Sequence, residues 1–309
     1  MKEEKDLLLE TKDLVKYFKT SRGALHAVDH VDLSIPARRT LGVVGESGCG
    51  KSTLGRTILR LVEPTSGSVR FHGEDITAYG EKQMREARRK LQMIFQDPYA
   101  SLNPRKTVSE LIEDPLKVYR VPKSERADKV RELMDVVGLS QRFAHAYPHE
   151  LDGGRRQRIG IARALIVEPE FIVADEPISA LDMSIRAQVL NLLRQLQKQR
   201  GITYLFIAHD LSVMRYISDR IAVIRKGNIL ELADAEELVT HPLHPYTRSL
   251  LSAIPMPDPR REREKQLLVY DPAMHDYTAA PPAWRELRPR HWVLCNDAEA
   301  ERWSAENIF

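Results

Sequence analysis

Short apolar runs alternate along the chain with segments whose apolar residues repeat at helical spacing. Four-residue runs of apolar residues and glycine are the clearest, at 41–44, 171–174, 204–207 and 221–224. An unbroken apolar run of this length is typical of a strand that is buried on both faces in a parallel sheet. Helical periodicity follows the first run in Leu54, Ile58, Leu59 and Leu61, and is clear again at 126–137 and 184–199. The alternation of the two patterns predicts an α/β protein.

Other patterns surround this core. Residues 7–45 and 67–71 contain further β-like runs, and residues 97–170 have a mainly helical pattern, so we expect a helical insertion. Beyond about residue 236, prolines interrupt any regular pattern, and we expect an irregular C-terminal extension: Pro242, Pro245, Pro255, Pro257, Pro259, Pro272, Pro281 and Pro282.

Composition narrows the class of protein. The 309 residues are enough for two modest domains, or for one domain with a subdomain and a tail. No apolar run approaches the roughly 20 residues that cross a bilayer, and the charged N-terminus precedes no apolar signal core. The net charge of +3 is spread among mixed signs and gives no case for nucleic acid. Cys49 and Cys295 have neither disulfide-framework nor zinc-ligand spacing. These features predict a cytosolic protein.

One segment fits a phosphate-binding pattern. Gly45-Glu46-Ser47-Gly48-Cys49-Gly50-Lys51-Ser52-Thr53 matches G-x-x-x-x-G-K-[ST] between a predicted strand and a predicted helix. Glycines allow the backbone to curl around an anion, and the helix that follows adds its positive N-terminal end. Lys51 is expected to reach the β- and γ-phosphates, and Ser52 to hold Mg²⁺. A glycine-rich turn without function is the alternative, but the strand–loop–helix context argues against it.

Polar residues end three of the predicted strands. Asp175 and Glu176 follow the run 171–174, where Asp175 can hold Mg²⁺ through water and Glu176 can polarise the water that attacks the γ-phosphate. His209 follows the run 204–207, and Gln96 ends the segment 91–96. Side chains at the carboxyl ends of parallel strands face the ligand crevice. We therefore expect His209 near the γ-phosphate and Gln96 near Mg²⁺ or the water.

These motifs, in this order and at these spacings, resemble those of the nucleotide-binding subunits of ABC transporters. The resemblance also includes a signature-like Leu151-Asp152-Gly153-Gly154-Arg155 and Ser179-Ala180-Leu181-Asp182, and it covers about residues 7–255 in detail. Two further segments, 96–104 and 241–255, look like the ATPases of oligopeptide and dipeptide importers. The segments 171–182 and 205–218 look most like the second of the two ATPase subunits that such importers carry.

The resemblance implies a fold and a domain organisation. A P-loop NTPase (RecA-like) α/β core would carry an antiparallel β subdomain, a helical subdomain at about 97–162 and a C-terminal extension. The nucleotide-binding domain would span 7–255, and the oligopeptide-transporter-type extension 256–309. The extension lacks the cysteine cluster of some relatives, so no iron–sulfur centre is expected.

The resemblance also implies partners and cofactors. The chain would bind ATP and Mg²⁺, and would hydrolyse ATP to energise import of oligopeptides or dipeptides. It would pair with a second ATPase subunit, with a homodimer as the alternative. The helical region would dock on two transmembrane permease subunits. An extracytoplasmic solute-binding protein would be an indirect partner. The chain would therefore lie peripherally on the cytoplasmic face of the membrane. An aromatic ring would stack on adenine, and the family spacing favours Phe18 over Tyr17.

The sequence departs from the family at the signature, which usually reads L-S-G-G-Q. In the family each ATP lies between one subunit's phosphate loop and the other's signature, whose serine donates to the γ-phosphate; here Asp152, Gly153, Gly154 and Arg155 would take that place. An ionised Asp152 accepts hydrogen bonds only and brings negative charge toward phosphate. One hypothesis is an impaired signature and the other is neutral drift with Arg155 compensating. Arg38 and Arg290 also stand where relatives commonly have glycine.

Three functional alternatives remain open from the sequence. A regulatory subunit that binds ATP with little turnover is compatible with Asp152, although Lys51, Asp175, Glu176 and His209 argue for hydrolysis. A soluble ABC ATPase of DNA repair or translation would be expected to carry coiled-coil arms, zinc-binding cysteines or duplicated cassettes, which this sequence lacks. Nickel or another small solute is an alternative cargo.

Overall fold

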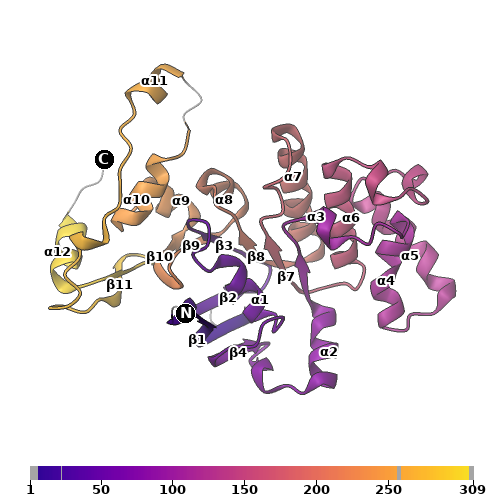
Figure 1. The fold of residues 1–309 in the computed structure, drawn as a ribbon, viewed down its shortest axis with the longest axis horizontal. Helices are drawn as coiled ribbons and strands as arrows, with labels where there is room; N and C mark the ends of the chain where they lie inside the picture. The colour runs from indigo at the N-terminus through magenta and orange to yellow at the C-terminus, as the bar shows by residue number, and fades with distance from the viewer. Residues whose placement is uncertain (1–5, 22, 256–258, 306–309) are drawn as a thin grey trace.

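Two sheets organise the chain in the computed structural model, which describes residues 6–21, 23–255 and 259–305 (Figure 1). The smaller sheet is antiparallel, in the order β2-β1-β4-β5: Gly23–Pro36, Leu7–Thr20, Ser66–Phe71 and Glu74–Asp75. Sequence reasoning found only short β-like runs in residues 7–36. The structure forms two 14-residue strands there. Several register shifts occur along their pairing, so the two strands stay hydrogen-bonded although their apolar and polar residues do not alternate regularly.

The larger sheet has the strand order β11-β12-β10-β9-β3-β8-β7-β6. Five neighbouring strands, β9, β3, β8, β7 and β6, run parallel: Arg220–Arg225, Thr40–Val44, Thr203–Ile207, Phe171–Asp175 and Leu91–Ile94. The first four of them confirm the four apolar runs as buried strands. Their side chains alternate between two cores. Val173, for example, faces the smaller sheet, whereas Ile172 and Ala174 face the helices.

Helices cover both faces of the larger sheet. Helix α1 (Lys51–Ile58) packs between the two sheets and contacts strands of each. The opposite face carries α7 and α8, and the predicted helical insertion follows beside them, at the right of Figure 1. The remaining helices before the C-terminal part are α2 (Glu81–Lys90), α3 (Pro98–Ser101), α4 (Val108–Val118), α5 (Lys123–Val136), α6 (Gly153–Leu165), α7 (Met183–Arg200) and α8 (Leu211–Ile217).

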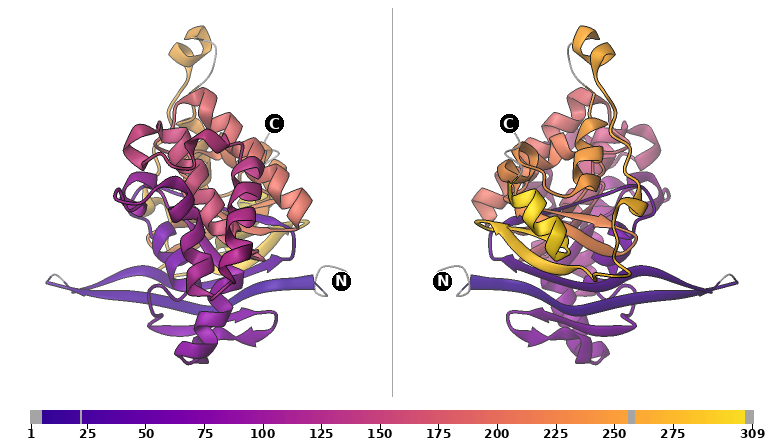
Figure 2. Two further views of the ribbon diagram at one scale, coloured as in Figure 1. Left: turned by 90° about the vertical axis from the view of Figure 1, so that its right-hand side faces the viewer. Right: turned by 90° about the vertical axis from the view of Figure 1, so that its left-hand side faces the viewer.

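The expectation that the chain is irregular beyond residue 236 is wrong. The C-terminal segment, residues 235–305, contains helices and a hairpin whose strand β12 pairs antiparallel with β10 (Asn228–Asp234), so it extends the core sheet (Figure 2). Prolines lie at the starts or outside of these elements, where they break no backbone hydrogen bond. The elements are α9 (Ala235–Thr240), α10 (Pro245–Ser252), α11 (Pro259–Glu264), β11 (Ala283–Arg288), β12 (His291–Cys295) and α12 (Asp297–Ala305).

Buried rings hold the C-terminal segment together. His244 lies within 5.7 Å, between ring centres, of Tyr270, His275 and Trp303. Its Nδ1 atom accepts a hydrogen bond from the backbone N–H of Tyr246 (3.0 Å) and thereby caps α10. Burial lowers the pKa of His244 to about 3, with a smaller contribution from nearby His275, Arg225 and Arg248.

We therefore expect acid to destabilise this segment. The pKa of His244 is lower in the folded chain than its ordinary value of about 6.5, so the unfolded chain binds more protons between these two pH values. The free energy of unfolding should fall by about 1.4 kcal/mol per pH unit as pH drops below about 6.5. All three tryptophans, Trp284, Trp292 and Trp303, lie in this segment, so denaturant unfolding followed by tryptophan fluorescence reports on it directly.

His244→Asn is the matched control for this prediction, because asparagine keeps a capping acceptor but does not titrate. The variant should show a shallower dependence on pH between 6.5 and 5 than the unmodified chain. Equal slopes for the two proteins would contradict the assignment to His244.

Arg38 and Arg290, which the resemblance places at glycine positions of the family, have left-handed backbones. Arg38 has φ of 61° and Arg290 has φ of 62°. A non-glycine residue in this conformation costs on the order of 1 kcal/mol. Both residues therefore carry backbone strain of this size.

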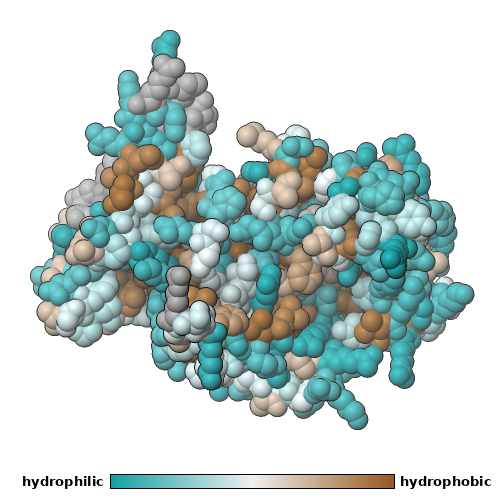
Figure 3. All heavy atoms as spheres, viewed as in Figure 1, coloured by the Kyte–Doolittle hydropathy of each residue, from teal (hydrophilic) through white to brown (hydrophobic). Residues whose placement is uncertain are grey.

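Most of the surface is polar. On the face seen in Figure 3, hydrophilic residues predominate and apolar residues form small separate groups. Across the described residues, no helix combines the length and the apolar character needed to span a membrane.

Candidate nucleotide site

The phosphate loop, Gly45–Thr53, connects β3 to α1 as the sequence predicts. Gly48 and Gly50 have φ of 77° and 111°, which favours glycine at both positions. At Gly50 a side chain is also excluded by space, because a Cβ atom would lie 2.0 Å from the carbonyl oxygen of Ala27. No side chain caps the start of α1, so its first N–H groups remain available to an anion.

Lys51 is buried beneath the loop. Its Nζ atom donates to the carbonyl oxygens of Gly45 and Glu46, each at 2.8 Å. Burial also raises the pKa of the Cys49 thiol, which therefore stays protonated at neutral pH. The loop thus presents a fixed cation and backbone N–H groups, an arrangement that suits a phosphate chain.

A hydroxyl and a carboxylate meet at the carboxyl ends of the strands. Ser52 Oγ donates to Asp175 Oδ1 at 2.7 Å, although the two residues are 123 positions apart in the sequence. Asp175 is fully buried, and its Oδ2 atom has no hydrogen-bond partner among the described residues; the Arg56 guanidinium lies 3.6 Å from it. Oxygen donors of this kind suit Mg²⁺, so Ser52 and Asp175 fit the predicted ion.

Ligands besides Ser52 and Asp175 would have to complete the coordination shell of such an ion. Within the described part of the chain, no group of three or more His, Cys, Asp or Glu side chains is placed to hold a metal. Mg²⁺ commonly takes one or two protein oxygens and fills its remaining positions with water and substrate phosphates. The predicted third contributor, Gln96, points instead to Glu176 in this structure.

Two other predicted residues, Gln96 and His209, lie close to the carboxylate of Glu176. Gln96 Nε2 donates to Glu176 Oε2 at 2.9 Å, and His209 Nδ1 lies 3.8 Å from the same oxygen. The backbone of Glu176 has φ of 45°, and its N–H donates to the carbonyl of Ile207 on β8. Strained backbone of this kind, at about 1–3 kcal/mol, concentrates at functional sites. The structure therefore brings Gln96, Glu176 and His209 together, as the strand ends predict.

A hollow of about 550 Å³ opens over these groups. The phosphate loop, Gln96 and Glu176 line it, together with Phe18 and residues 24–27. Tyr17, the alternative for adenine stacking, is occupied elsewhere: its ring stacks on His26 at 3.8 Å and its hydroxyl donates to Asp29. Phe18 is the ring that remains exposed toward the hollow.

The signature, Leu151–Arg155, contributes no lining residue to this hollow among those described. Asp152 caps α6, because its Oδ1 atom accepts from the N–H of Arg155 at 2.8 Å. Arg155 Nη1 donates to Asp152 Oδ2 at 2.7 Å, and its guanidinium lies over the Phe143 ring. Both oxygens of Asp152 are therefore engaged within the signature, and Arg155 pairs with Asp152 rather than pointing away.

Sequence reasoning missed the role of Arg186. Its guanidinium donates to the carbonyl oxygens of Leu181 (2.6 Å) and Ser179 (3.2 Å). Arg186 thus fixes the loop that follows Glu176. The only sequence signal for it is an arginine near the start of a helix, which is too common to identify such a contact.

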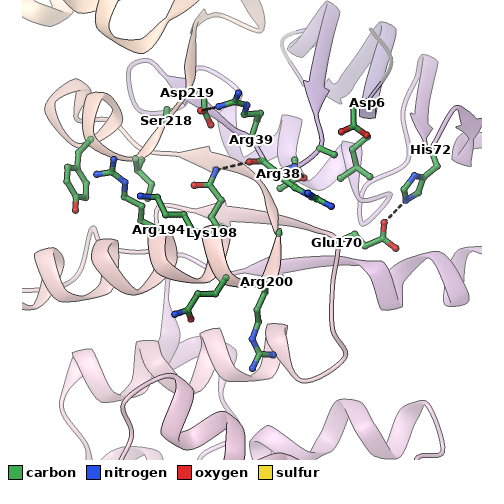
Figure 4. Close-up of a pocket in the computed structure, with 18 residues that line it drawn as sticks. Asp6, Arg38, Arg39, His72, Glu170, Arg194, Lys198, Arg200, Ser218 and Asp219 are labelled. Carbon is green, nitrogen blue, oxygen red and sulfur yellow. Dashed lines mark hydrogen bonds and ion pairs between the residues drawn. The ribbon is translucent and has the colours of Figure 1, made fainter. Parts of the chain in front are cut away.

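A larger hollow, of about 790 Å³, lies at the amino ends of β3 and β8 (Figure 4). Two ion pairs lie within its lining, Arg39 with Asp219 and His72 with Glu170. None of the predicted site residues is among the described residues that line it. Because parallel strands present their ligand crevice at the opposite ends, this hollow is not the nucleotide site.

Two family models match parts of the chain. The family model described as "ABC transporter" matches residues 28–179, and the model described as "Oligopeptide/dipeptide transporter, C-terminal region" matches residues 230–279. The chain is also similar to solved structures of ATP-binding cassettes. A dimeric post-hydrolysis state of the cassette MJ0796 bound to ADP and Pi is 30% identical with a TM-score of 0.68, covering 74% of this chain and 99% of that one.

The chain belongs to the ATP-binding subunits of ABC transporters. Within that family it is similar over nearly its whole length to two proteins named "Oligopeptide transport ATP-binding protein OppF". The protein of Bacillus subtilis (strain 168) is 55% identical, over 96% of this chain and 99% of the relative. The protein of Streptococcus pyogenes serotype M1 is 52% identical, over 97% and 98%.

Proposed function

We propose that this chain binds and hydrolyses ATP to energise the import of oligopeptides through an ABC transporter. The observation that carries the proposal is the contact of Ser52 with Asp175 beside the group of Gln96, Glu176 and His209. It joins the phosphate loop to the acidic strand end, so one ligand can touch both. The likeness to oligopeptide transport ATP-binding proteins over the full chain supports the cargo class.

The residues have distinct roles in this proposal. The backbone N–H groups of the phosphate loop and Lys51 bind the phosphates, and Phe18 stacks on adenine. Ser52, Asp175 and Gln96 would hold Mg²⁺, which would supply charge neutralisation on the phosphates. Glu176 accepts hydrogen bonds from the attacking water, and His209 contacts the γ-phosphate from the neighbouring strand.

Each nucleotide site is proposed to be shared between two subunits. The signature of this chain does not line its own nucleotide hollow. In a dimer it could instead face a nucleotide bound to the partner, through Asp152, Gly153, Gly154 and Arg155. The dimeric state of the related cassette supports such pairing. We propose a second, different ATPase subunit as the partner, because a homodimer would carry the altered signature at both sites.

The altered signature makes the two sites unequal. Asp152 has no hydroxyl to donate to a γ-phosphate, and its carboxylate repels one; at 4 Å and an effective dielectric of 20 this repulsion is about 4 kcal/mol. The ion pair with Arg155 offsets part of it. We propose that the phosphate loop of this chain forms the working site and that its signature serves a weaker one.

Exposed aromatic side chains suggest where the membrane partners dock. Phe95, Tyr99 and Tyr147 are exposed on or beside the helical subdomain at 97–162. We propose this surface as the contact with two permease subunits, which places the chain peripherally on the cytoplasmic face. A solute-binding protein would act on the other side of the membrane.

The domains proposed are 7–255 and 256–309.

The proposal is tested by reconstituting the chain, its partner ATPase and the permeases in liposomes with an external peptide-binding protein. ATP should drive accumulation of a labelled oligopeptide, and omission of this chain should abolish it. Uptake of nickel instead of peptide would contradict the cargo. ATP binding without turnover or uptake would favour the regulatory alternative.

A further inference from the structure

The phosphate loop donates a hydrogen bond to a distant part of the chain. Tyr246, on α10 of the C-terminal segment, places its hydroxyl oxygen 3.0 Å from the backbone N of Glu46 and accepts its N–H. The two residues are 200 positions apart. The motif around Tyr246 suggested a transporter subgroup but gave no reason for a contact with the nucleotide site.

The same peptide group also holds Lys51. The N–H of Glu46 and the carbonyl of Gly45 belong to one planar trans peptide, so their directions are fixed relative to each other. Tyr246 binds the N–H end, and Lys51 Nζ donates to the carbonyl end at 2.8 Å. Rotation of this peptide would break both hydrogen bonds. The orientation that Tyr246 imposes is therefore the orientation that seats the ammonium group of Lys51.

Tyr246 is itself rigidly placed. Its ring is fully buried, packs edge-on against Tyr270 at 5.4 Å and lies under the guanidinium of Arg225 at 5.5 Å. Burial raises the pKa of Tyr246 to about 12, so its hydroxyl is neutral at physiological pH. A buried ring that is fixed on several sides holds its hydroxyl oxygen in one position without further ordering cost on nucleotide binding.

We propose that Tyr246 is a positioning residue for ATP binding, which orients the Gly45–Glu46 peptide and thereby Lys51. The inference rests on the proposed function of the phosphate loop as the ATP site. It gives the C-terminal segment a role in that site, because a displacement of α10 would move Tyr246 and lower the affinity of the phosphate loop for ATP. Tyr246 would act through Lys51 and the loop, since it is not among the described residues that line the nucleotide hollow.

Tyr246→Phe tests the proposal, because it removes the hydroxyl and keeps the buried ring. The full chain should bind the non-hydrolysable analogue AMP-PNP with Mg²⁺ about tenfold more weakly, since the partly buried N–H of Glu46 loses its acceptor and the Gly45–Glu46 peptide loses its fixed orientation. In the reconstituted transporter the KM for ATP should rise by a similar factor with kcat nearly unchanged. Tyr270→Phe is the matched control: its ring belongs to the same group, but among the described residues its hydroxyl makes no hydrogen bond to the loop.

The outcomes separate this proposal from the function it rests on. Binding of AMP-PNP by the unmodified chain and the Tyr270→Phe variant, with about tenfold weaker binding by Tyr246→Phe, supports it. Equal affinity and equal KM for the unmodified chain and Tyr246→Phe overturn it and leave the ATP site intact. A fall in the amount of folded protein with unchanged KM assigns Tyr246 a structural role only and also overturns it. Failure of the unmodified chain to bind AMP-PNP overturns the ATP site itself.

Discussion

Replacing Glu176 with glutamine is expected to reduce ATP turnover of the assembled transporter by at least 100-fold while MgATP still binds. Glutamine keeps the size of the side chain and the hydrogen bond to Gln96 but cannot act as a base toward water. Positioned general bases contribute about 10²- to 10⁴-fold. The loss should be this large because the other composite site, which uses the signature with Asp152, contributes little.

Phosphate release from the purified complex, together with nucleotide binding at equilibrium, measures this effect. Glu168→Gln is the control, since it makes the same chemical change at an exposed ion pair with Lys129. A fall in turnover of only about half would mean that both sites work equally and would contradict the proposed inequality.

Restoring the signature is expected to produce the opposite effect. In a heterodimer that carries Glu176→Gln, residual turnover comes from the site that this chain's signature completes. Asp152→Ser with Arg155→Gln should raise that residual turnover by about 30-fold, because a charge-assisted donor worth about 2 kcal/mol replaces a repelling carboxylate.

The single changes serve as matched controls. Asp152→Ser alone should give part of the gain. Arg155→Gln alone should give none, since it removes the ion-pair partner of Asp152 and leaves the carboxylate uncompensated. No gain from the double change would show that Asp152 is tolerated, as the neutral-drift hypothesis holds.

Local patterns were sufficient to predict the centre of this fold. The buried parallel strands have continuous apolar runs, and Gly48 and Gly50 occur where a loop must curl. Strand ends also predicted that Gln96, Glu176 and His209 would meet, because parallel strands share one edge.

Contacts between distant segments could not be predicted in this way. Nothing in the residues around Tyr246 indicates that its hydroxyl meets Glu46, because the contact depends on how α10 packs against the core. The hairpin of β11 and β12 was missed because short strands among prolines have no distinct periodicity. The contacts of Tyr17 with His26 and Asp29 were not predicted either, because they depend on the register of two paired strands.

The central claim is that the phosphate loop of this chain forms the working ATP site of an unequal pair. Vanadate trapping with photoreactive, labelled ATP in the assembled transporter tests it most directly, since only a site that has hydrolysed ATP retains the label as trapped ADP. The account predicts that most trapped label is cross-linked beside the phosphate loop of this chain. Equal labelling of the two ATPase subunits, or labelling mainly beside the partner's loop, would contradict it.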